Sequence, residues 1–169
     1  MKSILLFTLI APGFFLSMSG HVAVSADNKA PIIDSITVFK SKRIMTVYCN
    51  GKAFKSYLIA LGKNPTGKKE FQGDFKTPEG LYYIDAKSRQ SKYHKNLNIT
   101  YPNQQDIARA KQNGRSAGGY IKIHGLPNGF DDDDYERTDW TWGCIALTNK
   151  EIDEVYRQIK LGSPILILP

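Results

Sequence analysis

The chain has 169 residues, a formal net charge of +7 and 41% hydrophobic residues, which suits one domain with its own core. The basic residues are scattered rather than gathered into one stripe, which argues against a nucleic-acid-binding protein. A basic chain of this kind is instead attracted to anionic surfaces.

Residues 1–26 predict a secretory signal peptide. A charged start is followed by an apolar run over residues 4–16, and small residues form a cleavage pattern that ends at Ala26. The alternative is a membrane anchor, but the run is shorter and more broken than the roughly 20 apolar residues that span a bilayer. We therefore expect residues 27–169 to be exported to the periplasm or cell wall, without a stable membrane span.

The first half of the mature chain is predicted to be rich in strands. Alternating apolar and polar residues predict strands at residues 36–39, 43–48, 53–61 and 80–84. Asn50-Gly51 predicts a tight hairpin turn, because both positions favour positive φ. In the strand that follows, Tyr57, Ile59 and Leu61 share one face, and residues 62–73 are predicted to form an exposed loop.

Two helices and two strands are predicted in the second half. Residues 103–113 form the first helix, which ends at Gly114 and has Ile107 and Ala110 on one face. The strands lie at residues 120–124 and 165–168.

The second predicted helix has signals at both of its ends. Thr148 is its N-cap and forms a capping box with Glu151, and Gly162 is expected to end it. Six or more short strands with two small helices favour a single mostly-β domain, a sandwich or barrel, over residues 27–169.

One histidine has a defined position at the end of a predicted strand. Ile121 and Ile123 share one face of that strand, so His124 lies on the opposite face, where Gly125 ends the strand. A lone histidine on a strand is more often structural, and this applies fully to His94 in its polar stretch.

A second candidate for chemistry is Cys144. Gly143 before it lets the backbone approach closely, and Ile145 is expected to face the core, so that Cys144 and Ala146 face the other way. Acyl transfer needs a thiol beside amides that hold an oxyanion, together with a base such as His124. The alternative is a small buried cysteine without chemistry.

These residues resemble a known signature. His124-Gly125 followed by Thr141-x-Gly143-Cys144 is similar to the motif of the L,D-transpeptidase catalytic domain, also called the YkuD domain. Residues 73–84, 101–103 and 139–149 also resemble the family, in particular a branch of envelope enzymes acting where peptidoglycan meets the Braun lipoprotein.

The resemblance implies a mechanism and a site. Cys144 would be the nucleophile of a thioester acyl-enzyme on peptidoglycan peptide stems, and His124 its base. The resemblance implies no cofactor and no metal. The remaining residues implied for the site are Gly143 and Trp142 at the oxyanion, and Thr141, Tyr120, Trp140 and Gly125 at the substrate.

Several alternatives stay open. Many family members carry arginine where this chain has Ala146, which leaves substrate pose open and gives weight to the named branch. Hydrolysis on the same thiol, by an L,D-carboxypeptidase or an amidase releasing wall-attached lipoprotein, is one rival. A wall-binding module without catalysis is another. Either Asp139 or a backbone carbonyl could orient His124.

Two further features have competing interpretations. The acidic run at residues 131–134 could be a metal site, a solvated loop or a negatively charged surface that attracts a cationic amine. It lacks the spacing of a calcium-binding loop. Cys49 shares a strand face with Val47, which favours a packed thiol over a disulfide with Cys144.

Overall fold

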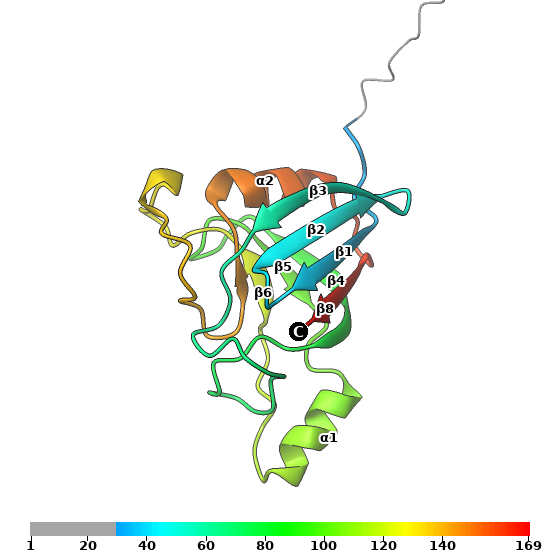
Figure 1. The fold of residues 1–169 in the computed structure, drawn as a ribbon, viewed down its shortest axis with the longest axis vertical. Helices are drawn as coiled ribbons and strands as arrows, with labels where there is room; N and C mark the ends of the chain where they lie inside the picture. Colours follow the sequence, from blue (N-terminus) through cyan, green and yellow to red (C-terminus); the bar gives the residue numbers. More distant parts are fainter. Residues whose placement is uncertain (1–29) are drawn as a thin grey trace, which may run out of the picture.

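The structure, a computed structural model, describes residues 30–169, and the predicted signal peptide lies outside the described residues. The strands form one eight-stranded sheet in the order β3-β2-β1-β8-β4-β5-β6-β7, which curls around a core (Figure 1). This mostly-β architecture confirms the predicted fold class. Within residues 30–169, no helix combines the length and apolar character needed to cross a bilayer.

The elements have the following bounds. The strands are β1 (Ser35–Phe39), β2 (Ile44–Cys49), β3 (Lys52–Leu58), β4 (Gly80–Ser88), β5 (Asn96–Ile99), β6 (Lys122–His124), β7 (Ile145–Ala146) and β8 (Pro164–Leu168). The helices are α1 (Gln104–Gln112) and α2 (Asn149–Gln158), with a single 3-10 turn, η1 (Asp132–Asp134). Each predicted strand is present, whereas β5 and β7 were not predicted. The four residues of β5 directly follow a long polar stretch, and β7 has only two residues, too few for an alternating pattern.

The β2–β3 hairpin confirms the predicted turn. Asn50 and Gly51 have φ values of 51° and 70°, the left-handed conformation that this turn requires. The neighbouring strand β1 pairs antiparallel with β2 and parallel with β8. The C-terminal strand therefore lies in the middle of the sheet rather than at its edge.

The two ends of the sheet meet beside the segment that carries Cys144. Beyond β3, Ala60 exchanges two backbone hydrogen bonds with Ala146 of β7, at 3.0 and 2.8 Å. Gly62 then bridges to Thr141. A Cβ atom at Gly62 would lie only 2.0 Å from the Phe75 carbonyl oxygen, so this seam needs glycine.

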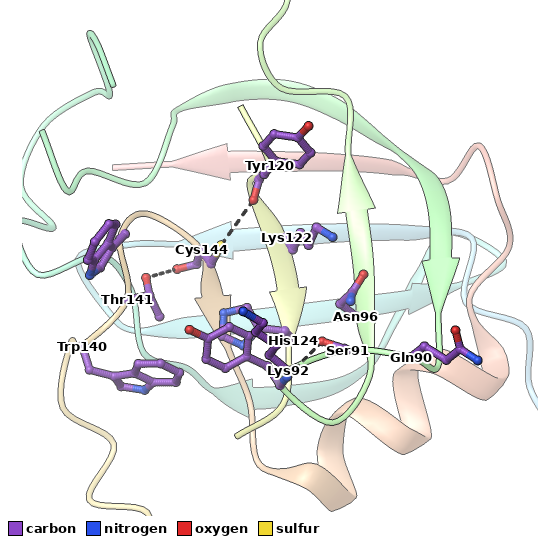
Figure 2. Close-up of a pocket in the computed structure, with 12 residues that line it drawn as sticks. Gln90, Ser91, Lys92, Asn96, Tyr120, Lys122, His124, Trp140, Thr141 and Cys144 are labelled. Atoms are coloured by element: carbon purple, nitrogen blue, oxygen red, sulfur yellow. Dashed lines mark hydrogen bonds between the residues drawn. The ribbon is translucent and has the colours of Figure 1, made fainter. Parts of the chain in front are cut away.

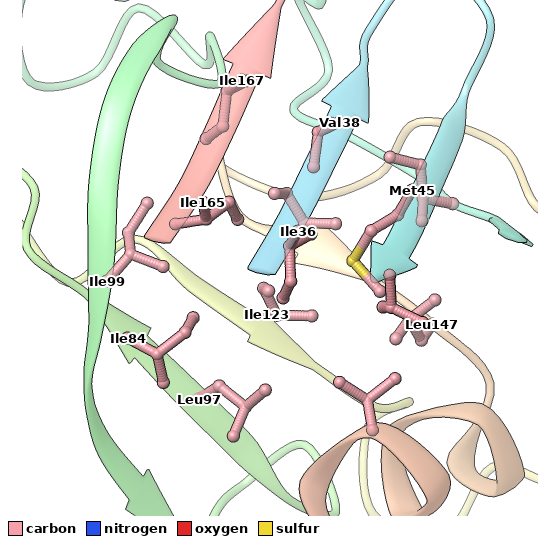
Figure 3. Close-up of a cluster of buried hydrophobic side chains, with 14 of the residues drawn as sticks. Ile36, Val38, Met45, Ile84, Leu97, Ile99, Ile123, Leu147, Ile165 and Ile167 are labelled. Atoms are coloured by element: carbon pink, nitrogen blue, oxygen red, sulfur yellow. The ribbon is translucent and has the colours of Figure 1, made fainter. Parts of the chain in front are cut away.

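The core lies inside the curled sheet and is closed on one side by α2. Figure 3 shows Ile36 and Met45 facing Ile84 and Leu97 across this space. Burying each such side chain contributes about 1.5–3 kcal/mol relative to leaving it in water. The helix adds two fully buried side chains, Ile152 and Val155.

The structure corrects the prediction for α1. Ile107 is 52% exposed, and the buried residues of this helix are Asp106 and Ala110. Asp106 is buried because its carboxylate accepts a hydrogen bond from the Tyr82 hydroxyl at 2.9 Å and completes a capping box with Asn103. The predicted apolar stripe is thus replaced by a polar anchor.

Two further predictions need correction. The Thr148–Glu151 capping box of α2 is confirmed, but the helix ends at Gln158 rather than near Gly162. It ends early because Ile159 becomes extended and bridges to Ile33. The loop at residues 62–73 is mostly exposed, yet it contains a buried lysine, Lys69.

Candidate active site

A cavity of about 560 Å³, here called the first cavity, opens beside β6 (Figure 2). Its walls come from β6, from Tyr120 two residues before that strand, from Asn96 of β5, from the turn that precedes β7 and from a loop at residues 90–93. Six residues expected at the site from the sequence line it: Tyr120, His124, Trp140, Thr141, Trp142 and Cys144. The other two, Gly125 and Gly143, contribute backbone next to it.

His124 is held by its own neighbour in sequence. Strand β6 directs Ile123 into the core and His124 to the opposite face, as the period of two predicts. The imidazole Nδ1 donates a hydrogen bond to the Gly125 carbonyl at 2.7 Å, so Nε2 is the proton acceptor of the neutral ring. The carboxylate of Asp139 is occupied elsewhere, with the Arg43 guanidinium and the Leu61 amide.

Aromatic rings keep His124 dry. The Tyr93 and Trp140 ring centroids lie 4.7 and 5.5 Å from that of His124, which is 4% exposed. Burial, assisted by the nearby positive charge of Lys122, lowers the pKa of His124 to about 4 despite the opposing bond to Gly125. The imidazole is therefore neutral at physiological pH, as a general base must be.

Cys144 rests as a thiol. Its sulfur donates a weak hydrogen bond to the Tyr120 carbonyl over 3.6 Å, and Tyr120 takes a φ of 59° there. Burial raises the pKa of Cys144, partly offset by the backbone and charge of Lys122. Cys144 and His124 are thus an uncharged pair at rest, and the thiol would lose its proton as it attacks.

The turn before Cys144 is fixed by a hydroxyl. The Thr141 Oγ1 donates to the Cys144 carbonyl at 2.8 Å and accepts from the Gly143 N–H at 3.1 Å. Gly143 has a φ of 122°, and a Cβ there would lie 2.6 Å from the Lys76 carbonyl oxygen. The turn thus requires glycine, and its Gly143 N–H, expected to hold an oxyanion, is bonded within the turn in this structure.

A second cavity, of about 450 Å³, reaches Cys144 from its other side. Cys144, Tyr120 and Trp142 line both cavities. Trp142 is 75% exposed and packs edge-on against Phe75, with ring centroids 5.8 Å apart. The thiol can therefore be approached from two directions.

The acidic run does not belong to either cavity wall. Asp132 accepts hydrogen bonds from the backbone amides of Asn149 and Lys150, and so caps the N-terminus of α2. Among residues 30–169, no group of His, Cys, Asp or Glu side chains is arranged to hold a metal ion. A structural cap therefore accounts for Asp132 better than capture of an amine.

The other histidine and cysteine have structural surroundings. The His94 Nε2 lies 2.8 Å from the Asp153 carboxylate, which ties the loop at residues 90–93 to α2. Cys49 is a free thiol packed against the edge of the core, and Cys144 is also free.

Sequence reasoning missed three residues of the first cavity that matter for its chemistry. Lys122 lies two residues before His124, so the period of two could have placed it on the same face. Asn96 lies directly opposite His124 in the β5–β6 pairing, which sequence spacing does not reveal. Tyr93 comes from a loop without a regular pattern.

Comparisons with known proteins agree with this geometry. The family described as the L,D-transpeptidase catalytic domain, YkuD, matches residues 33–167. The protein YafK of Escherichia coli K12 is 32% identical over 154 residues, which cover 86% of this chain and 56% of YafK.

Solved structures with a similar fold are also found. The helical cell shape determining protein Pgp2 from Campylobacter jejuni matches with a TM-score of 0.60 and 27% identity, over 83% of this chain and 51% of Pgp2. Bd1075 from Bdellovibrio bacteriovorus matches with a TM-score of 0.58 and 27% identity, over 82% of this chain and 51% of its own. This chain spans about half the length of these relatives.

Proposed function

We propose that this chain, which belongs to the L,D-transpeptidase catalytic domain family, transfers acyl groups between peptide stems of peptidoglycan through a thioester on Cys144. The observation that carries the proposal is that Cys144 and the buried, neutral His124 line the same cavity. The Nε2 of His124 is free to accept a proton, and the Cys144 thiol lines the same cavity.

The reaction follows from these two groups. The Cys144 sulfur attacks the carbonyl of the diamino acid at the third position of a stem, while His124 Nε2 takes the thiol proton. The amide bond to D-alanine then breaks, and His124 returns the proton to the leaving amine. The thioester that remains is attacked by an amine, which forms the new amide and restores the thiol.

Backbone amides are proposed to stabilise the oxyanion of each tetrahedral intermediate. The Gly143 N–H is bonded to Thr141, so the Cys144 N–H and Trp142 N–H are the donors assigned to this task. Thr141 then acts as a positioning residue that holds the turn, while Tyr120 and Trp140 form the walls against which the stem lies.

Access to Cys144 from two sides gives a transfer reaction a separate route for its acceptor. An acyl group bound through the first cavity leaves the second cavity open, so that an acceptor amine can reach the thioester carbonyl. Water can follow the same route, and L,D-carboxypeptidase or lipoprotein-releasing amidase activity is therefore the second candidate. We place either reaction in the cell envelope, where the stems are found, and extend to this chain the role in cell shape for which the Campylobacter protein is named.

The test is incubation of the purified protein with tetrapeptide muropeptides, with and without an acceptor stem, followed by mass spectrometry. Cross-linked dimers that lack one D-alanine are expected. Shortened stems without dimers would replace the transferase by a carboxypeptidase, and release of lipoprotein from wall sacculi would indicate an amidase. Unchanged stems and sacculi would overturn the proposal.

A further inference from the structure

We propose that Lys122 and Asn96 form a carboxylate-binding subsite in the first cavity, which holds an acidic group of the donor stem. The inference rests on the proposed function, since it names the part of the donor that this site recognises. Neither residue was assigned a role by the sequence pattern.

Several partly or fully buried lysines of the described residues are held in ion pairs. Lys40, Lys69 and Lys95 each pair with a carboxylate, from Glu79, Asp74 and Asp153 respectively. Lys122 is not held in this way among the described residues, and neither are Lys68, Lys76 and Lys87, but of these four only Lys122 lines the first cavity. Within the described part of the chain, Lys122 has no ion pair and no side-chain hydrogen bond, although it is half-buried and lines the cavity. A partly desolvated cation without a counter-ion favours the binding of an anion.

Asn96 is a second, independent sign of a ligand. It is 5% exposed and lines the first cavity, yet its side chain makes no hydrogen bond to the described residues. The amide is therefore free to offer two N–H donors to a group bound in the cavity. Figure 2 shows Asn96 and Lys122 on adjacent strands, on the same side of the sheet as His124.

The surrounding charges select an anion. The described residues that line the first cavity include two lysines, Lys92 and Lys122, and no carboxylate. Ala146, which lies beside His124 in the β6–β7 pairing, is fully buried and brings no charge of its own. An ammonium beside amide N–H groups matches a carboxylate, which accepts hydrogen bonds at both oxygens.

A tetrapeptide stem offers two carboxylates near the scissile bond. One is the C-terminal carboxylate of D-alanine, and the other belongs to the side chain of the diamino acid. Three donors distinguish them: the natural tetrapeptide, its C-terminal amide, and a tetrapeptide with lysine in place of diaminopimelate. The enzymes compared are the wild type, Lys122→Met and Lys111→Met, where Lys111, exposed on α1 and outside both cavities, is the matched control for loss of one charge.

We expect Lys122→Met to raise KM for the natural donor about tenfold, the cost of one charge-assisted hydrogen bond. The same substitution should have little effect on the donor that lacks the recognised carboxylate, and Lys111→Met should have little effect on any donor. Equal losses on all three donors would overturn the subsite, because Lys122 would then act on the chemistry or the fold. No loss on any donor would overturn it as well.

Alkylation of Cys144 tests the same inference without turnover. Iodoacetate carries a carboxylate and iodoacetamide does not, so the ratio of their rates reports anion binding independently of thiol reactivity. This ratio should fall about fivefold in Lys122→Met and about twofold in Asn96→Ala, but hold steady in Lys111→Met. An unchanged ratio in Lys122→Met overturns the subsite, whereas a protein that shows the ratio change but no stem turnover would count against the proposed function alone.

Discussion

The two cavities that share Cys144 differ in charge. The first has two lysines in its wall, one of them half-buried beside His124. The second has one lysine, Lys69, whose ammonium is held 2.7 Å from the buried Asp74 carboxylate. The first cavity therefore presents unneutralised positive charge to a ligand, while the second presents glycine backbone and exposed aromatic rings. The unneutralised positive charge therefore lies on the side of Cys144 that also holds His124.

Removal of the Cys144 thiol, which both cavities share, should abolish turnover of peptide stems. Cys144→Ala should reduce stem turnover at least 10³-fold, as loss of a covalent nucleophile does. The free energy of unfolding should change by less than about 1 kcal/mol, because the thiol makes only a weak hydrogen bond. Muropeptide assays and chemical denaturation measure the two quantities. A folded Cys144→Ala protein that keeps either transfer or hydrolysis would contradict the assignment.

The buried His124 in the wall of the first cavity should make the free energy of unfolding depend on pH. The folded-state pKa of His124, about 4, lies below its ordinary value of 6.5, so the unfolded chain takes up a proton first as pH falls. Stability contributed by the neutral ring is complete above pH 6.5 and is lost progressively as pH falls towards 4, by about 3 kcal/mol. Denaturant titrations at several pH values should show this slope.

The matched variant for this slope is His124→Gln, which keeps a polar side chain but cannot titrate. Its stability should vary less between pH 6.5 and 4 than that of the wild type. Equal slopes in the two proteins would mean that other groups, rather than this histidine, carry the acid sensitivity.

Narrowing each cavity in turn should separate their roles. Gln72 and Gln90 are exposed and line the second and first cavities respectively. Gln72→Trp should lower the ratio of transfer to hydrolysis about tenfold, because an acceptor is larger than water, while Gln90→Trp should raise donor KM and leave that ratio unchanged. Mass spectrometry of the products measures the ratio of transfer to hydrolysis in each variant. The same ratio in both variants would mean that donor and acceptor enter by one route.

The smallest effect is expected at Cys49, which lies outside both cavities. Cys49→Ala should change turnover less than twofold and cost about 1 kcal/mol of stability, from lost contacts at the core edge. Turnover and denaturation assays on the purified variant test this. Loss of activity in a folded Cys49→Ala protein would assign a second thiol to the reaction.

The sequence predicted the residues of this site that belong to short local patterns. His124 follows an alternating strand, and Gly143-Cys144 follows a turn that only glycine can make, so both could be placed on the cavity side of their elements. The capping box of α2 is likewise local. These features depend on neighbours within a few residues, which is the range that sequence patterns describe.

Features made by distant segments were not predictable in this way. Asn96 is opposite His124 only because β5 and β6 pair, and Tyr93 covers the imidazole only because its loop is tied to α2 through His94. For the acidic run at residues 131–134, a local pattern suggested a ligand site that the structure does not support. Asp132 instead caps the N-terminus of α2. Burial of Asp106 in place of Ile107 has the same origin, a partner supplied by another strand.

The seam between Ala60 and Ala146 bears on the order of folding. It joins segments 86 residues apart, and the neighbouring bridge from Gly62 to Thr141 is nearly as long-range. Contacts of high sequence separation carry the largest loop-closure entropy and form late. The turn that holds Cys144 lies beside this seam, so a chain that has folded only its local hairpins has not yet assembled the candidate site. Assembly of the site therefore depends on long-range closure of the sheet and not on the local hairpins alone.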